Sequence, residues 1–162
     1  MPYTAPPPIH LQELEDRLRS SPGLSQKVGI RTAYEPIGDS VRLPPVFGHG
    51  MVRLGDDCAA LPTSDGWLLF AIEGLIERFV NDDPWFAGYS ALMVNLSDIS
   101  AMGGRPMAVT DALWLGSEGK TKEIWAGMLA ASMAYGVPIV GGHTAHGSQR
   151  TNLAVSAAEL SR

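Results

Sequence analysis

The sequence predicts an α+β domain with a mainly antiparallel sheet and helices packed on one of its faces. Two observations support this class. Short apolar runs of strand length alternate irregularly with longer segments that have helical spacing, and there is no internal repeat. The 162 residues are 45% hydrophobic and only 18% charged, which allows a sizeable buried core and excludes disorder over most of the chain.

The N-terminal part of the chain, residues 1–45, differs from the remainder in composition. Residues 1–8 are rich in proline, which lacks a backbone donor, so we expect a flexible, extended arm. Leucines recur at helical spacing over 9–19 and predict an amphipathic helix. Prolines and glycines mark 24–45 as irregular chain. We therefore place the domain itself at 46–162.

The domain contains six apolar runs of strand length and two long helical segments. The predicted strands are 52–54, 59–61, 67–72, 107–115, 138–140 and 153–160. One helix is expected to begin at Pro84, after two aspartates that favour a helix start, and to run to about Met102. The other is expected from Thr121 to about Gly136, and the Gly141-Gly142 pair predicts a turn.

Helical spacing also predicts which faces of these two helices enter the core. The core face of the first helix is expected at Leu92, Leu96 and Ile99, and that of the second at Trp125, Leu129 and Met133.

Composition excludes several classes of partner. The net charge is −5 and no lysine or arginine cluster is present, so a nucleic-acid partner is not expected. The uncharged stretch 124–142 is interrupted by Gly136-Val137-Pro138, which favours a helix, a turn and a strand over a membrane span. The single cysteine, Cys58, cannot form an internal disulfide, and this suits a reducing cytoplasm. We expect a cytoplasmic protein.

Acidic residues near turns and strand ends are candidate metal ligands. Asp98 is the only charged residue of the first long helix, and Asn95 lies on the same helical face. Asp56 and Asp57 occupy a glycine turn, and Glu73 ends a buried strand. If these carboxylates converge, their repulsion demands a counter-ion, and such oxygen ligands suit Mg²⁺ bridged to phosphates. The alternative is that Asp98 caps a loop or pairs with an arginine, and that Glu73 is a solvated edge residue.

A second candidate segment follows the strand at 138–140. It consists of Gly141, Gly142, His143 and Thr144. Consecutive glycines allow backbone N–H groups to approach phosphate oxygens closely, although an ordinary turn has the same pattern. A zinc site formed by His143, His146 and Cys58 is another reading, but it lacks a fourth ligand. The common P-loop and dinucleotide-binding motifs are absent.

Taken in order, four segments resemble the N-terminal domain of the aminoimidazole ribonucleotide (AIR) synthase superfamily, which includes thiamine-monophosphate kinase. They are LGDDCAAL at 54–61, AIEGL at 71–75, VNLSDISAMGGRP at 94–106 and VGGHT at 140–144. The third segment is highly specific, and the other three gain weight from their order. The resemblance covers about two-thirds of the chain.

The resemblance implies an ATP-dependent enzyme in which Mg²⁺ ions hold the triphosphate against acidic residues. Asp57 and Asp98 match metal-binding aspartates, and Glu73 stands where the family has an aspartate. Asn95 matches the asparagine of the specific segment. Gly142 and His143 match a Gly-Asp pair that contacts nucleotide and metal in the kinase.

The resemblance further implies a homodimer in which the sheets pair into a barrel, a small-molecule substrate and a second, C-terminal domain. The chain ends before that domain, so a separate C-terminal half is an expected partner. Ala71 and Ile72 replace two hydroxyl residues that help to hold metal in the kinase, and His143 replaces an aspartate. The alternative function is therefore a non-catalytic dimerisation module that has lost nucleotide chemistry.

Overall fold

The computed structural model describes residues 10–22, 35–38, 40–42, 50–55, 57–116 and 118–161. The chain divides into two compact units, 1–39 and 40–162. The first contains helix α1 (Leu11–Arg19), which the leucine spacing predicted. The arm expected at 1–8 and most of the irregular chain expected at 24–45 lie outside the described residues.

The second unit is built on two sheets. Strands β1 (Ser40–Arg42) and β2 (Met51–Arg53) form an antiparallel pair. The larger sheet has five strands in the order β3-β4-β7-β5-β6. Its strands are β3 (Ala59–Thr63), β4 (Gly66–Gly74), β5 (Ala108–Leu115), β6 (Ile139–His146) and β7 (Asn152–Ser161). Each of these strands overlaps a predicted one.

The large sheet is mixed, which corrects the expectation of a mainly antiparallel sheet. Strand β6 pairs parallel to β5, whereas β3 with β4, β4 with β7 and β7 with β5 are antiparallel. The reason is the 18-residue helix α5 (Glu118–Tyr135) between β5 and β6. A helical crossover of this length carries the chain back to the end of the sheet at which β5 began, so that the next strand runs in the same direction as β5.

The turn predicted at Gly141-Gly142 is also wrong, because both glycines lie inside β6. That strand continues to His146 and pairs with β5 over its whole length, so that Gly141 faces Thr110 and Gly142 faces Asp111. Gly142 is explained by a close approach rather than by a turn. A Cβ atom on Gly142 would lie 2.1 Å from the Oδ1 atom of Asp111.

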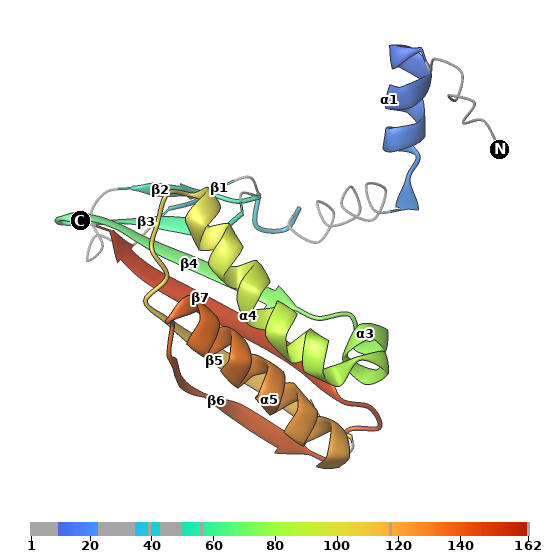
Figure 1. Cartoon of the computed structure of the whole chain (residues 1–162). Helices are drawn as coiled ribbons and strands as arrows, with labels where there is room; N and C mark the ends of the chain where they lie inside the picture. The colour runs from blue at the N-terminus through green and yellow to red at the C-terminus, as the bar shows by residue number, and fades with distance from the viewer. Residues whose placement is uncertain are drawn as a thin grey trace, which may run out of the picture. The chain divides into compact units, whose positions relative to one another are not determined.

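Helices cover one face of the large sheet (Figure 1). They are the short α3 (Glu77–Asp82), α4 (Pro84–Ala101) and α5. Helix α4 begins as its sequence predicted, with Pro84 in the first turn and the Asp83 side chain accepting a hydrogen bond from the Phe86 N–H at 3.3 Å. No helix among the described residues is long and apolar enough to cross a membrane.

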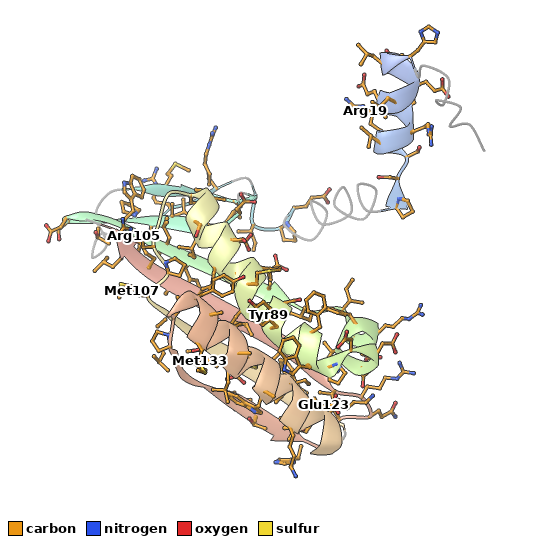
Figure 2. All side chains as sticks on the ribbon, in the orientation of Figure 1. Arg19, Tyr89, Arg105, Met107, Glu123 and Met133 are labelled. Carbon is orange, nitrogen blue, oxygen red and sulfur yellow. The ribbon has the colours of Figure 1, made fainter. Side chains whose placement is uncertain are left out.

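The core lies between the helices and the sheet, and one of its two predicted helix faces is wrong. Leu92, Leu96 and Ile99 of α4 are buried as expected. On α5 the buried stripe is Ile124, Met128 and Ala131. The predicted residues are shifted by one or two positions, so that Trp125 is only partly buried while Leu129 and Met133 are 52% and 84% exposed. Figure 2 shows Met133 on α5.

Candidate functional site

Two carboxylates and a glycine lie in one row across the large sheet. Glu73 of β4 pairs with Val155 of β7, Val155 pairs with Asp111 of β5, and Asp111 pairs with Gly142 of β6. Residues that face each other across neighbouring strands share a face of the sheet. Because Val155 and Asp111 are buried in the core, the row belongs to the face that the helices cover.

Asp111 is a buried acid next to the predicted phosphate segment. Its side chain is only 7% exposed, and its Oδ2 atom has no hydrogen-bond partner among the described residues. Burial raises the pKa of Asp111 above its ordinary value of 3.8, because a charged carboxylate loses its hydration in the core. The absent side chain of Gly142 makes room for this carboxylate. The arrangement is able to hold a proton or to meet a cation.

The segment Gly141 to Thr144 is exposed on an edge strand of the sheet. Gly142 and Thr144 pair with Asp111 and Leu113 on the helix-covered face, while Gly141 and His143 belong to the opposite face. A Cβ atom on Gly141 would meet nothing within 4 Å, so the protein's own packing does not require glycine there. The backbone at Gly141 is therefore open to a ligand.

The predicted metal ligands are distributed over three places in the fold. Asp57 precedes β3 and is exposed, Glu73 is exposed on β4, and Asp98 is partly buried near the end of α4. Glu73 and β6 are three strand spacings apart, or about 14 Å. Asp56 lies outside the described residues.

The structure does not gather these acids into a ready-made metal centre. In the ranges described, no three His, Cys, Asp or Glu side chains are close enough together to hold a metal ion. The oxygen donors still suit Mg²⁺, which usually takes one or two carboxylates and shares the remainder of its shell with phosphates and water. The same finding leaves the zinc reading without support, and its third ligand, Cys58, is buried.

Asn95 is buried inside the protein and does not reach the surface in this conformation. Its side chain is fully buried, its Nδ2 donates to the backbone oxygen of Ala91 at 2.8 Å, and its Oδ1 has no partner among the described residues. The role of Asn95 in cofactor binding stays a prediction. In this conformation the Asn95 side chain bonds only to the backbone of its own helix, as far as the described residues show.

Sequence reasoning missed two buried acids, Asp111 and Glu159. The Oε2 atom of Glu159 also has no described partner, and a Cβ atom on Gly104 would lie 2.9 Å from it. A signal was present for Asp111, because it is the one charge inside the apolar strand MAVTDALWL. For Glu159, at the end of an alternating strand, the sequence does not distinguish a buried from a solvated position.

Comparison with protein families places this geometry in context. The model for "AIR synthase related protein, N-terminal domain" matches residues 55–160. An uncharacterized protein of Synechocystis sp. is 59% identical over 100 residues, which are 61% of this chain and 31% of that protein. Thiamine-monophosphate kinase of Methanospirillum hungatei is 35% identical over 103 residues, which are 60% of this chain and 35% of the kinase. The chain thus spans about a third of these relatives.

Solved structures share the fold. Thiamine monophosphate kinase from Aquifex aeolicus matches with a TM-score of 0.62 and 23% identity, over 86% of this chain and 44% of that one. A structure of AaThiL complexed with AMPPCP and TMP matches with a TM-score of 0.60 and 20% identity, over 94% of this chain and 44% of that one. At these identities the likeness concerns the arrangement of strands and helices.

Proposed function

Because this chain belongs to the AIR synthase related family through residues 55–160, we propose that it is the Mg²⁺- and ATP-binding domain of an ATP-dependent phosphotransferase or synthetase. The complete enzyme would transfer or cleave the γ-phosphate of ATP to activate an oxygen or an amide on a small metabolite. A related solved structure, AaThiL, is complexed with AMPPCP, a nucleotide analogue, which supports ATP as the nucleotide.

The observation that carries the proposal is the exposed glycine segment of β6 beside the buried carboxylate of Asp111. β6 is an edge strand, so alternate backbone N–H groups of the segment point away from β5, and the two glycines put no side chain near them; Thr144 adds a hydroxyl on the same strand. Asp111 lies directly across from Gly142. Phosphoryl transfer requires mainly positioning and charge neutralisation, which these groups are suited to give.

Individual roles follow from the chemistry of the side chains. Asp57, Glu73 and Asp98, with Asp56 from the part of the chain not described, would hold several Mg²⁺ ions, each through one or two carboxylates and the phosphates, and these ions would neutralise charge on the triphosphate. Gly141, Gly142 and His143 would contact the phosphates. Asn95 would contact the nucleotide, and its bond to the Ala91 carbonyl one turn earlier orients its side chain.

A second copy of the chain is the proposed partner of the uncovered sheet face. We define this face by the large apolar side chains on the side of the sheet away from the helices, which are Phe70, Ile72, Trp114 and Leu160. Each is at least 41% exposed. Pairing of two such faces would bury these side chains, as a barrel of two sheets does. A separate C-terminal half remains a proposed partner as well.

One observation favours the alternative, a dimerisation module without nucleotide chemistry. The acids form no metal-holding group within the described ranges, whereas the uncovered sheet face carries several large apolar side chains that are at least 41% exposed. Under this alternative the chain would dimerise through the uncovered sheet face and would not bind Mg²⁺-ATP.

Thermal melting with ATP, with and without Mg²⁺, decides between the two functions. A ligand at a hundred times its dissociation constant adds about 2.7 kcal/mol to the free energy of unfolding. For a chain of this size that corresponds to a rise in Tm of roughly 5–10 °C. We expect the rise only when Mg²⁺ is present. A Tm that stays constant at millimolar ATP would exclude the nucleotide-binding function and leave the module.

The substitution Asp98→Asn tests the site itself. The change removes the charge but keeps the size of the side chain, so we expect the Mg²⁺-dependent rise in Tm to disappear while the Tm without ligand is kept. Asp65→Asn is the matched control, because Asp65 is an exposed acid in the turn between β3 and β4. An unchanged ATP response in the Asp98 variant would contradict its role as a metal ligand.

A further inference from the structure

A pocket of about 350 Å³ lies beyond the ends of β5 and β6, and none of its lining residues belongs to the segment Gly141 to Thr144. Figure 1 shows α3, the first turn of α5 and the β6–β7 connection at this end of the sheet. The lining residues are Asn81, Asp82, Gly116, Lys120, Gln149 and Arg150. All six are polar or glycine, and the volume is at the lower end of the range for small-molecule sites.

Hydrogen bonds between four segments fix the shape of this pocket. Asn81 donates from Nδ2 to the backbone oxygen of Thr151 at 2.9 Å, and Lys120 Nζ donates to Asn81 Oδ1 at 3.0 Å. The N–H of Gly116 donates to Thr151 Oγ1 at 3.1 Å, and the Thr151 side chain is fully buried. The pocket is therefore pre-formed, which lowers the entropic cost of binding.

Gly116 has a steric function in this arrangement. A Cβ atom at this position would lie 2.7 Å from the backbone of Arg150. Only glycine lets the end of β5 approach the β6–β7 connection this closely. The approach brings Arg150 and Lys120, which are 30 positions apart in the chain, to the same pocket.

The charges of the pocket favour an anion. Lys120 donates to the neutral amide oxygen of Asn81 and forms no ion pair with a carboxylate among the described residues. Arg150 pairs with Glu77 at 3.3 Å, but both side chains are about half exposed and such a pair contributes little. The positive end of α5 adds to the same potential, since Lys120 lies in its first turn.

Asp82 indicates that the anion is part of a larger molecule. Its carboxylate is bound by Arg78 at 3.1 Å and still lines the pocket. A carboxylate repels a bare anion but accepts hydrogen bonds from hydroxyl groups. Two cations together with an acceptor suit a phosphate group carried by a hydroxylated carbon chain.

We propose that this pocket binds the phosphate group of a small phosphorylated metabolite, with Lys120 and Arg150 as its charged contacts. The Gln149 amide would donate to the same oxygens. This inference goes beyond the proposed function, because it adds a second anion site to the chain and does not depend on nucleotide binding. The pocket is distinct from the residues proposed for Mg²⁺-ATP.

Calorimetric titration of the full chain with glycerol 3-phosphate, without nucleotide, tests the pocket. We expect Lys120→Gln to weaken binding at least tenfold, or about 1.4 kcal/mol. Lys120→Arg keeps the charge and should bind within about threefold of the unmodified chain. Lys122→Gln is the matched control, because Lys122 is exposed on the same helix and does not line the pocket; it should bind as the unmodified chain does.

Three results would overturn the assignment. The first is no heat of binding at about 10 mM glycerol 3-phosphate, and the second is equal affinity of the Lys120→Gln variant and the unmodified chain. The third is tighter binding of inorganic phosphate than of glycerol 3-phosphate, which would make the free ion the ligand. Circular dichroism melting of each variant without ligand checks the fold.

The same variants separate this inference from the proposed function. Lys120→Gln should retain the Mg²⁺-dependent response to ATP. If glycerol 3-phosphate binds but ATP gives no response, the pocket stands and the nucleotide-binding function fails. If ATP raises the Tm but glycerol 3-phosphate does not bind, the nucleotide-binding function stands and the pocket assignment fails.

Discussion

Asp111 carries a carboxylate whose surroundings do not balance its charge. Burial raises its pKa above 3.8, so at pH values between the unfolded and the folded pKa the native state binds more protons than the unfolded state. The contribution of Asp111 to the free energy of unfolding therefore falls as the pH rises through that window. At neutral pH Asp111 destabilises the fold, and residues that do so are frequent at functional sites.

The substitution Asp111→Asn should stabilise the chain at pH 7. The amide keeps the shape and has no charge to desolvate, so we expect a gain in the free energy of unfolding at pH 7 that disappears below the unfolded-state pKa of the carboxyl group. Urea unfolding at several pH values measures it, with Asp65→Asn as the exposed control. A loss of stability at pH 7 would show that a cationic group balances the carboxylate.

The two neighbouring glycines of β6 should respond differently to alanine. Gly142→Ala places a Cβ atom against Asp111 and should cost about 1–3 kcal/mol of unfolding free energy. Gly141→Ala has open space and should change stability by less than about 0.5 kcal/mol. Chemical denaturation of both variants gives the comparison, and equal costs would contradict the close approach of Asp111 to β6.

At the scale of elements, the contact between α4 and α5 depends on two glycines. A Cβ atom on Gly88 would lie 2.1 Å from the backbone oxygen of Ile124, and one on Gly127 would lie 1.9 Å from that of Trp85. The two backbones are thus in direct contact. A stacked pair, Trp85 and Tyr89, covers the junction with ring centroids 5.6 Å apart.

Gly127→Ala should destabilise the chain although alanine favours helices. The favourable helix propensity of about 1 kcal/mol is smaller than the cost of separating two packed backbones, and we expect a net loss of about 2 kcal/mol. The control is Ala126→Ser, at an exposed position of the same turn, with a change of less than about 0.5 kcal/mol. A stabilised Gly127→Ala variant would mean that the helices are farther apart.

The sequence predicted where the helices and strands lie, but it did not predict every packing contact between them. Apolar runs located all the strands of the large sheet, because short apolar runs bounded by turn residues are typical of buried strands, although the runs at 59–61 and 138–140 covered only part of β3 and β6. The core face of α5 was wrong because the stripe from Trp125 to Met133 is as apolar as the stripe from Ile124 to Ala131. The sequence of a helix with two apolar stripes does not indicate which one meets the sheet.

The candidate site divides in the same way. Gly141 to Thr144 and the acids were visible as motifs, and the environment of Asp111 required the register of β5 and β6. The pocket at Lys120 could not be predicted, because Asn81 and Thr151 are 70 positions apart and meet only in the folded chain. Contacts of this kind leave no local pattern.

At the scale of the whole second unit, α3, α4 and α5 lie on one face of the large sheet, and no described helix of this unit covers the other face, which carries large apolar side chains. Ile72, for example, is 67% exposed. Monomeric proteins rarely leave such a patch in water. We have therefore assigned this face to a second copy of the chain.

Ile72→Glu should convert the dimer to a monomer, because a charge at the centre of the paired faces would be buried without a partner. Sedimentation velocity over a range of protein concentrations measures the change. Leu129→Glu is the matched control on the helix side, where 52% exposure gives a comparable apolar surface. If both variants sediment as the unmodified chain does, the uncovered face is not the interface.

The position of β7 constrains the order of events during synthesis. This strand is the last of the large sheet to leave the ribosome, yet it lies between β4 and β5, which are made much earlier. Until residues 152–161 emerge, β4 and β5 each lack the neighbour that joins them, and the nascent chain exposes two unsatisfied edges. Cooperative folding of the large sheet must therefore wait for β7, and during that interval protection by a chaperone would matter most.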